Sequence, residues 1–202
     1  MMPFKPRVIA FDVFGTLLHI KDRKKPYKKL LQWLNAHGRV PQPDDAALIM
    51  SNNLDFKQMM TLFESEVPSQ VVAQLQSVLE LELQSITLYE DTLCTIEKLK
   101  ALGYKLAVCS NLATPYGKVA AALLPTFDAY AWSYEVGAIK PDAKIYQHIL
   151  DQLACQADEV LFIGDTLLAD LQGPTAFGMS ARLIHRKHGQ KFADILQDLL
   201  DE

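Results

Sequence analysis

The sequence predicts an α/β fold with a parallel sheet, and three features of its pattern support this prediction. Short apolar runs of strand-like composition alternate with longer segments of helical periodicity. Polar residues follow several of these runs directly, and one long interval carries only helical patterns. The predicted strands are Val8 to Phe11, Lys105 to Cys109, Ala129 to Ser133, Val160 to Ile163 and Ala181 to Ile184.

The segments between these strands carry helix signals. Thr92 to Leu102 has apolar residues at helical spacing and stops at Gly103, which suits the position just after a helix. Asp142 to Leu153 follows Pro141, a residue that commonly begins helices. Apolar residues recur at helical spacing from Phe192 to Leu200 and predict a last helix that covers the sheet.

The interval from residue 19 to residue 88 lacks a convincing strand and predicts an inserted all-helical domain. Turn signals at 38–43 and 66–69 divide this interval. We therefore expect a core domain formed by residues 1–18 and 89–202, and a helical domain formed by residues 19–88. The predicted helices of the insertion are Pro26 to His37, Asp44 to Phe63 and Pro68 to Gln84.

The composition excludes several classes of function. Half of the 202 residues are hydrophobic and 22% are charged, which is typical of a globular protein. The balance of 20 Lys and Arg against 24 Asp and Glu predicts no nucleic acid and no membrane as partner. No apolar stretch approaches the ~20 residues of a membrane span. The three cysteines lack the spacing of a metal or disulfide site, so we expect a cytoplasmic protein. Because the charge balance favours neither nucleic acid nor membrane, we expect it to act on a small molecule.

The first candidate for chemistry is Asp12, which follows the first strand and begins the sequence Asp-Val-Phe-Gly-Thr at residues 12–16. Ligands of parallel sheets bind beyond the carboxyl ends of the strands, so Asp12 lies where reacting groups belong. An aspartate at a strand end is also typical of turns and helix caps. Its interpretation therefore depends on what the other strands contribute.

Two further carboxylates follow the strand at 160–163, in the sequence Gly-Asp-Thr-Leu-Leu-Ala-Asp at residues 164–170. Alone, Asp165 and Asp170 are also typical of a helix cap with a solvated acid in its first turn. If this strand neighbours the first strand, both converge on Asp12. Carboxylates that close raise one another's pKa or require a cation, and a set of oxygen ligands suits Mg²⁺. The sequence therefore predicts a magnesium site.

The end of the second strand adds a hydroxyl, and the segment before a predicted helix adds a cation. Ser110 and Asn111 follow the second strand, where a hydroxyl and free backbone N–H groups bind anions, although this pair is also common in turns. Lys140 precedes Pro141, which keeps the lysine backbone out of the following helix. A lysine among carboxylates would stabilise an anionic intermediate.

Together these four segments resemble the four ordered motifs of the haloacid dehalogenase superfamily of hydrolases. The resemblance covers about residues 7–18 and 89–185, and the insertion matches the cap of that family in position and helical character. It implies a Rossmann-like sheet of order 5-4-1-2-3 flanked by helices, with a small all-helical cap. It also implies a hydrolase with an aspartate nucleophile and a small anionic substrate, and we expect a monomer or a homodimer.

The resemblance assigns catalytic roles residue by residue. Asp12 would be the nucleophile, and Thr16 and Ser110 would contact the transferred group. Lys140 would stabilise the charge of that group.

The resemblance also assigns the binding residues. The residues that contact the substrate would be Phe14, Gly15 and Asn111. The ligands of the magnesium ion would be Asp12, the backbone carbonyl of Phe14, Asp165, and Asp170 directly or through water.

The sequence departs from the phosphatases of this family at Phe14. Those enzymes carry a second aspartate there, which protonates the leaving group and later activates water, and phenylalanine does neither. Losing a positioned general acid and base costs about 10²- to 10⁴-fold, roughly 3 to 5 kcal/mol of barrier. We therefore expect magnesium-dependent hydrolysis of a small phosphorylated metabolite, through an aspartyl-phosphate and at a reduced rate.

Two alternatives stay open. The 2-haloacid dehalogenases of the family also carry an aromatic residue at the position of Phe14, need no metal, and bind the substrate carboxylate with a cap arginine. Arg23 and Arg39 are the candidates for that arginine. The fourth motif of those enzymes has serine and asparagine where this chain has Asp165 and Leu167. This difference favours the phosphatase. The second alternative is a protein that binds phosphate esters without turning them over.

Overall fold

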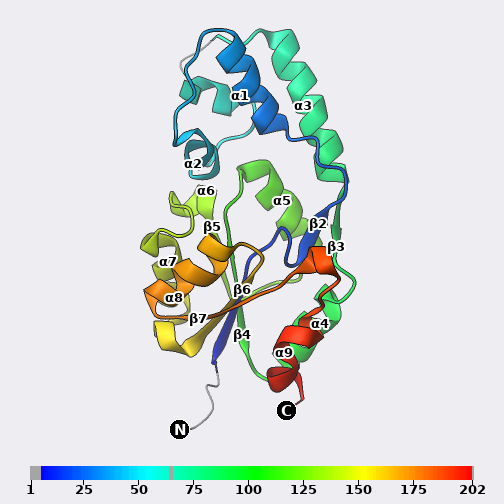
Figure 1. Ribbon diagram of the computed structural model, residues 1–202, viewed down its shortest axis with the longest axis vertical. Coiled ribbons are helices and arrows are strands. Elements are labelled where there is room, and N and C mark those ends of the chain that lie inside the picture. Colours follow the sequence, from blue (N-terminus) through cyan, green and yellow to red (C-terminus); the bar gives the residue numbers. More distant parts are fainter. Residues whose placement is uncertain (1–5, 64–65, 202) are drawn as a thin grey trace.

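The computed structural model describes residues 6–63 and 66–201, and its centre is a five-stranded sheet (Figure 1). Each neighbouring pair of strands in this sheet is parallel, and the spatial order is β5-β4-β1-β6-β7. The strands are β1 (Val8–Phe11), β4 (Lys105–Ser110), β5 (Ala129–Trp132), β6 (Val160–Gly164) and β7 (Ser180–Leu183). Residues 1–5 and 202 of the predicted core and residues 64–65 of the predicted insertion lie outside the described residues.

The predicted fold class, a Rossmann-like α/β fold with a parallel sheet, is confirmed. Counted along the core strands alone, β7-β6-β1-β4-β5 is the order 5-4-1-2-3. The labels differ from this count because β2 and β3 form a separate ribbon. The last core strand begins at Ser180 and ends at Leu183, one residue earlier than predicted. Ile184 still donates its backbone N–H to the carbonyl of Gly164, at 2.9 Å.

Alternation along the buried strands builds one core on each face of the sheet. In β1, Phe11 belongs to the apolar cluster on one face and Ala10 to the cluster on the other. The first cluster includes residues of α4 (Thr92–Ala101) and α9 (Phe192–Leu200). The second includes residues of α7 (Ala143–Leu153). Helices on both faces are what a parallel sheet requires, because both of its faces are apolar.

The remaining core elements are short. They are α5 (Thr114–Leu123), α6 (Ser133–Val136), α8 (Gly173–Phe177), the 3₁₀ turns η2 (Ala157–Glu159) and η4 (Arg186–His188), and the π-helical turn η3 (Leu167–Gln172). The three cysteines are free thiols. Across the described ranges, every helix is too short or too polar to cross a membrane.

A second layer of helices, which we call the cap, lies beyond the carboxyl ends of the core strands (Figure 1). Its elements are α1 (Pro26–Ala36), α2 (Asp45–Met50), the 3₁₀ helix η1 (Gln58–Phe63) and α3 (Ser69–Gln84). The prediction of one helix from Asp44 to Phe63 is wrong. The Asn52 amide donates to the carbonyl of Leu48 at 2.8 Å, and Asp55 and Gln58 exchange two bonds between backbone N–H and side chain. Such local bonds compete with helix continuation.

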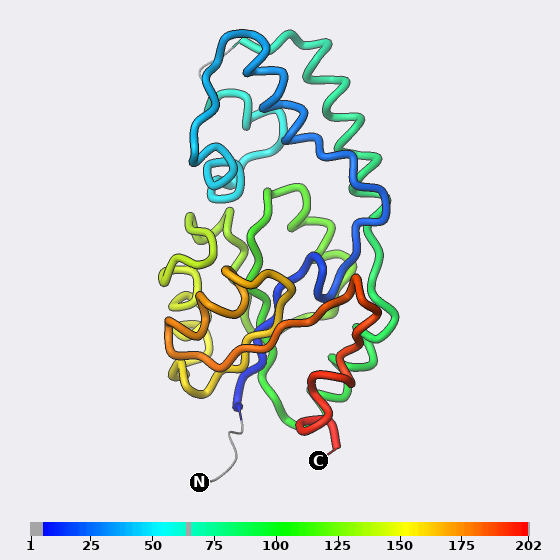
Figure 2. The backbone as a smooth tube through the Cα atoms, in the orientation of Figure 1, coloured from blue at the N-terminus to red at the C-terminus, as the bar shows by residue number. Residues whose placement is uncertain are grey.

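An antiparallel ribbon of β2 (Leu18–Ile20) and β3 (Ile86–Leu88) joins the core to the cap (Figure 2). The expectation that the interval 19–88 holds no strand is therefore wrong at both ends of the interval. Three-residue strands are too short to show a period of two, and their pairing joins segments far apart in the sequence. The division into two domains at residues 18 and 89 stays a prediction.

Glu82 ties the cap to the core. It lies near the end of α3, with 4% of its surface exposed. Its Oε2 accepts hydrogen bonds from the backbone N–H groups of Lys24 and Lys25, in the segment between β2 and α1. Its Oε1 accepts a hydrogen bond of 2.6 Å from the hydroxyl of Tyr116 in α5. One buried carboxylate thus holds an entry segment of the cap, an exit helix of the cap, and a core helix together.

Glu82→Ala should lower the free energy of unfolding by about 2 to 4 kcal/mol, because it leaves three donors without their acceptor, among them the buried hydroxyl of Tyr116. Urea denaturation followed by circular dichroism measures the change. Glu80→Ala is the matched control, since Glu80 is exposed on the same helix. An equal loss of stability in both variants would contradict the role given to Glu82.

Candidate active site

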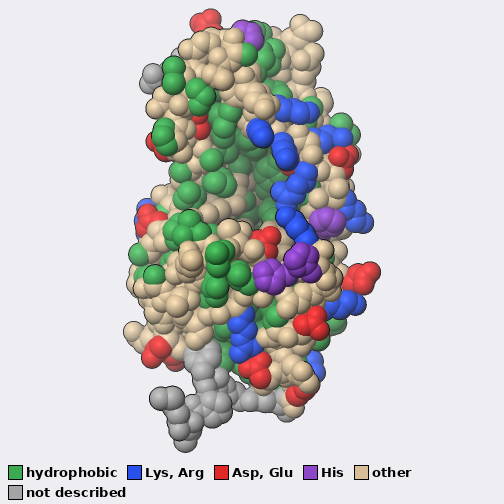
Figure 3. All heavy atoms as spheres, in the orientation of Figure 1, with side chains coloured by type: hydrophobic (Ala, Val, Ile, Leu, Met, Phe, Trp, Pro, Cys, Tyr) green, Lys and Arg blue, Asp and Glu red, His purple; other side chains and the backbone are tan. Residues whose placement is uncertain are grey.

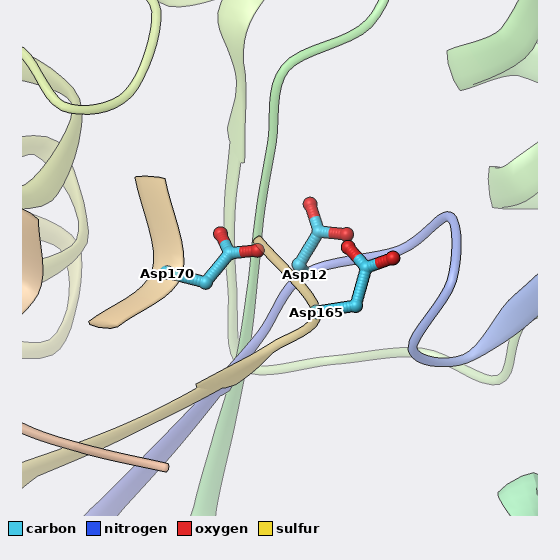
Figure 4. A group of neighbouring side chains, drawn as sticks. All are labelled: Asp12, Asp165 and Asp170. Atoms are coloured by element: carbon cyan, nitrogen blue, oxygen red, sulfur yellow. The ribbon is translucent and has the colours of Figure 1, made fainter. Parts of the chain in front are cut away.

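The ends of adjacent strands bring the predicted carboxylates together. The central strand β1 pairs in register with β4 and β6, so the residues that follow these strands lie side by side. Asp12, Asp165 and Asp170 each offer a carboxylate oxygen, and these atoms lie within 4.8 Å of one another. Figure 4 shows the three side chains gathered where the chain leaves β1 and β6.

Lys140 lies among these carboxylates and is buried, with 3% of its surface exposed. Its Nζ donates to Asp12 Oδ1 at 2.7 Å, to Asp170 Oδ1 at 2.6 Å and to the Cys109 carbonyl at 2.8 Å. These three bonds use all of its ammonium protons. The side chain of Asn111 accepts from Lys140 N at 2.6 Å and donates to Lys140 O at 2.9 Å. Asn111 therefore fixes the lysine backbone, and its contact with substrate stays a prediction.

The buried charges shift one another's pKa. Burial raises the pKa of Asp12 to about 6, while Lys140 opposes this rise and the Asp170 carboxylate adds to it. Burial alone would lower the pKa of Lys140, but the Asp12 and Asp170 carboxylates outweigh it and hold that pKa above its ordinary value. Burial also raises the pKa of Asp165. A single lysine therefore leaves the site with excess negative charge.

Ser110 and Asp170 complete the hydrogen bonding around these charges. The Ser110 hydroxyl donates to Asp12 Oδ1 at 2.9 Å, from the last position of β4. Asp170 is 1% exposed, and its Oδ2 accepts from the backbone N–H of Thr166 at 2.9 Å. Asp170 is thus a buried member of the carboxylate group, and the alternative of a solvated acid in a first helical turn is wrong.

Two glycines make room for the carboxylates. Gly15 has φ +92°, and a Cβ on it would collide with the carboxylate of Asp165. A Cβ on Gly164 would collide with the side chain of Asp170. The first position needs glycine for its backbone conformation and for the close approach, and the second for the approach alone. Contact of Gly15 with substrate stays a prediction.

Arg186 holds the loop that follows Asp12. The Thr16 carbonyl accepts from Arg186 Nε at 3.0 Å and Nη2 at 2.8 Å, and the same guanidinium pairs with Asp91 at 2.9 Å. Thr16 is fully buried, and its hydroxyl has no hydrogen-bond partner among residues 6–63 and 66–201. The sequence analysis missed Arg186, because it lies 170 residues after Thr16 and outside the four motifs.

Phe14 faces the cap side of the site. Its ring packs edge-on against Tyr116 with the centroids 5.8 Å apart, and it lines a pocket of about 370 Å³ between the cap and the core. A phenyl ring offers neither a proton donor nor an acceptor there. Coordination of a metal by the Phe14 carbonyl stays a prediction.

The two arginines proposed for a dehalogenase lie in different surroundings. Arg39 forms a bidentate ion pair with Asp45 inside the cap, at 2.8 and 2.5 Å. Arg23 lines the same pocket as Phe14. Geometry therefore favours Arg23 over Arg39 as a residue that meets a ligand.

The donor set fits a hard divalent cation. It consists of carboxylate oxygens, which Mg²⁺ prefers, and the three carboxylates of Asp12, Asp165 and Asp170 exceed the charge of Lys140 by two. Asp165 is exposed while the other two carboxylates are buried, so the cluster is open to solvent on one side. Asp12, Asp165 and Asp170 are therefore the residues that would hold a metal.

Comparison with known proteins supplies the family. A family model described as haloacid dehalogenase-like hydrolase matches residues 6–178. The chain belongs to the haloacid dehalogenase-like hydrolases. The family resemblance carried by the four motifs is therefore confirmed, and with it the membership of a hydrolase family.

Curated relatives of this haloacid dehalogenase-like hydrolase include phosphatases and a dehalogenase. The glyceraldehyde 3-phosphate phosphatase of Methanothermobacter thermautotrophicus is 28% identical over 128 residues, which cover 62% of this chain and 57% of that protein. The (S)-2-haloacid dehalogenase 4A of Burkholderia cepacia is 31% identical over 107 residues, or 52% of this chain and 46% of that protein. The chain thus spans about half the length of these relatives.

A solved structure supports the same fold. The crystal structure of a HAD phosphatase from Thermococcus onnurineus superposes on this haloacid dehalogenase-like hydrolase with a TM-score of 0.61 and 25% identity. The match covers 92% of this chain and 89% of the other. The likeness therefore extends over the cap as well as the core.

The raised pKa of Asp12 predicts how stability depends on pH without metal. A group whose pKa is higher in the folded state contributes stability below its unfolded pKa, and this is lost as pH rises through the folded value, here about 6. Relative to Asp12→Asn, which cannot titrate, the original protein should gain about 2 kcal/mol of unfolding free energy between pH 7 and pH 4.

Urea denaturation in EDTA at both pH values measures this difference. Asp158→Asn is the control, since Asp158 is an exposed aspartate on η2. A difference between the original protein and Asp12→Asn that stays constant from pH 7 to pH 4 would contradict the raised pKa.

Proposed function

We propose that this chain is a magnesium-dependent phosphatase that acts on a small phosphate ester through an aspartyl-phosphate on Asp12. The observation that carries the proposal is the buried Lys140, which bridges Asp12 and Asp170 beside a third carboxylate and still leaves two negative charges. A site of this kind binds a divalent cation readily, and a cation with a lysine attracts a phosphate dianion. Phosphatases among the curated relatives support the same reading.

The chain's own residues perform the steps as follows. The Asp12 carboxylate attacks phosphorus, the new bond from carboxylate oxygen to phosphorus forms, and the bond from phosphorus to the leaving oxygen breaks. Lys140 and the Ser110 hydroxyl, which both bond Asp12, lie where they stabilise charge on the transferred phosphoryl group. A bound Mg²⁺ would neutralise phosphoryl charge and orient the group for in-line attack.

The second step returns the free carboxylate. Water attacks phosphorus, the bond to Asp12 breaks, and inorganic phosphate leaves with the carboxylate restored. Phe14 neither supplies a proton to the leaving oxygen nor removes one from the water, so both protons exchange with solvent. We therefore expect slow turnover and a preference for leaving groups that depart without protonation.

A second candidate is metal-independent dehalogenation of a small haloacid. The aromatic residue at position 14 and the dehalogenase among the relatives favour it. The carboxylates of Asp165 and Asp170 oppose it, because without a cation they would repel the carboxylate of the substrate. The magnesium-dependent phosphatase is therefore the better supported proposal.

Purified protein should release phosphate from an activated aryl phosphate in MgCl₂, and EDTA should abolish the release. Asp12→Asn should lower the rate by about 10³-fold or more, because it removes the nucleophile. Asp158→Asn, on an exposed aspartate, should leave the rate unchanged. Phosphate is measured colorimetrically and the phenol by absorbance. Halide release from 2-chloropropionate that persists in EDTA would replace the phosphatase proposal with the dehalogenase.

Phe14→Asp should raise turnover by about 10²-fold for an alkyl phosphate, because a carboxyl group at this position can protonate the leaving oxygen and activate water. The gain should be smaller for 4-nitrophenyl phosphate, whose leaving group needs no proton. Phe14→Asn is the matched control, since its amide has a similar size and performs no acid–base catalysis. Equal rates for Phe14→Asp and Phe14→Asn would refute this account of Phe14.

A further inference from the structure

The pocket beside Phe14 has walls from both layers. Phe14 and Tyr116 belong to the core, and Leu31 of α1 and Ile49 of α2 belong to the cap. The space-filling view shows a hollow with hydrophobic side chains between the two layers (Figure 3). Phe14 lies two residues after Asp12 and Asn111 follows Ser110, and both line the pocket. The pocket therefore begins at the two loops that carry the nucleophile and its hydroxyl partner.

Apart from the side chains of Arg23 and Lys28 and the Tyr27 hydroxyl, the polar side chains of this pocket already have hydrogen-bond partners. The Glu82 carboxylate accepts hydrogen bonds from two backbone N–H groups and from the hydroxyl of Tyr116, so the hydroxyl proton of Tyr116 is already donated. The amide of Asn111 is paired with the backbone of Lys140. Tyr27 also lines the pocket, and its hydroxyl is buried and has no hydrogen-bond partner among the described residues.

A substrate rich in hydroxyl groups would therefore find few partners in the pocket. Moving a hydroxyl from water to an apolar place without a new hydrogen bond is unfavourable, whereas an apolar group gains from the same transfer. A volume of about 370 Å³ is enough for an aromatic ring with a substituent. The side-chain chemistry of the walls thus selects against a sugar-like leaving group.

Cations border the pocket on one side. Arg23 and Lys28 both line it and both are exposed. Over residues 6–63 and 66–201, neither side chain has an ion-pair or hydrogen-bond partner. Figure 3 shows Lys and Arg side chains in a band along one side of the hollow. The positive charge of Arg23 also acts on Tyr116 in the core wall, where it opposes the rise that burial and Glu82 cause in the pKa of the tyrosine.

We propose that this pocket binds the leaving group of the substrate, and that this group is apolar, preferably aryl, and ends in an anionic substituent that pairs with Arg23. This inference rests on the proposed phosphatase function, because it places the phosphoryl group at Asp12 and the rest of the ester against Phe14 and the cap. Arg23 is then a specificity-determining residue, and the apolar walls are the larger contribution to affinity.

The experiment measures binding of phosphonates that cannot be hydrolysed, by calorimetry in excess MgCl₂. Benzylphosphonate should bind at least about 10-fold more tightly than 2,3-dihydroxypropylphosphonate, because the ring becomes buried and the diol loses its hydration. Equal binding, tighter binding of the diol, or no binding of either compound would overturn the assignment of the pocket.

Two variants test the walls and the cation separately. Ala46→Trp adds bulk at an exposed position of the pocket lining, so it should weaken benzylphosphonate binding and leave inorganic phosphate binding unchanged. For Arg23, 4-carboxybenzylphosphonate should bind about 3- to 10-fold more tightly than the neutral 4-carbamoyl compound. Arg23→Gln should remove this preference. Lys29→Gln, on an exposed α1 residue outside the lining, should keep it.

The outcomes separate this inference from the function on which it rests. If the phosphonates bind in the expected order but no ester releases phosphate, the phosphatase proposal fails while the assignment of the pocket stands. If esters are hydrolysed but the order of the phosphonates is reversed, the assignment of the pocket fails alone. A carboxylate preference that survives in Arg23→Gln would overturn the role of Arg23.

Discussion

The ion pairs that Lys140 forms with Asp12 and Asp170 are the interactions on which the rest of the site depends. Burying an ammonium group is unfavourable by several kcal/mol unless its protons all find acceptors, and here the Cys109 carbonyl takes the third. Without Lys140, the two buried carboxylates of Asp12 and Asp170 would lie close together with no cation between them. The balance is incomplete, however, because Asp165 adds a third negative charge. The three carboxylates therefore leave net negative charge that a further cation would compensate.

This balance depends on parts of the chain that are far apart. The parallel order of β4, β1 and β6 brings Ser110, Asp12 and Asp165 to one edge of the sheet. Glycines at the turns let the carboxylates approach backbone that any larger residue would block. Asn111 fixes the lysine backbone, and the guanidinium of Arg186, from beyond the last core strand, holds the loop that follows Asp12. The local geometry of the site is thus a property of the whole core and not of one motif.

The sequence predicts the parts of this structure that depend on local pattern. Strands buried on both faces, helices with apolar stripes, and the polar residues just after strands all leave a signal in neighbouring residues. The sheet order, in contrast, was implied only by the family resemblance. The ribbon of β2 and β3 leaves no such signal, because three residues show no period. The polar stretch after Met50 ended a helix that apolar spacing alone would continue. Glu82 bonds Tyr116, 34 residues away, and Arg186 bonds Thr16, 170 residues away, and only the folded chain reveals those pairs.

Phe14 connects the loop that follows Asp12 with the pocket between core and cap. Its ring packs on Tyr116, which is bonded to Glu82, so position 14 belongs to the apolar contact between core and cap. A carboxyl group there would interrupt that apolar contact, whereas phenylalanine continues it from the loop after Asp12 to the cap. In the proposed mechanism the chain has no acid–base group at position 14, and this lack matters least for leaving groups that depart as stable anions. Aryl alcohols are such leaving groups, and they are also the ones that an apolar wall binds best. In the proposed function, the lack of an acid–base group at position 14 and the apolar walls of the pocket therefore favour the same substrate class.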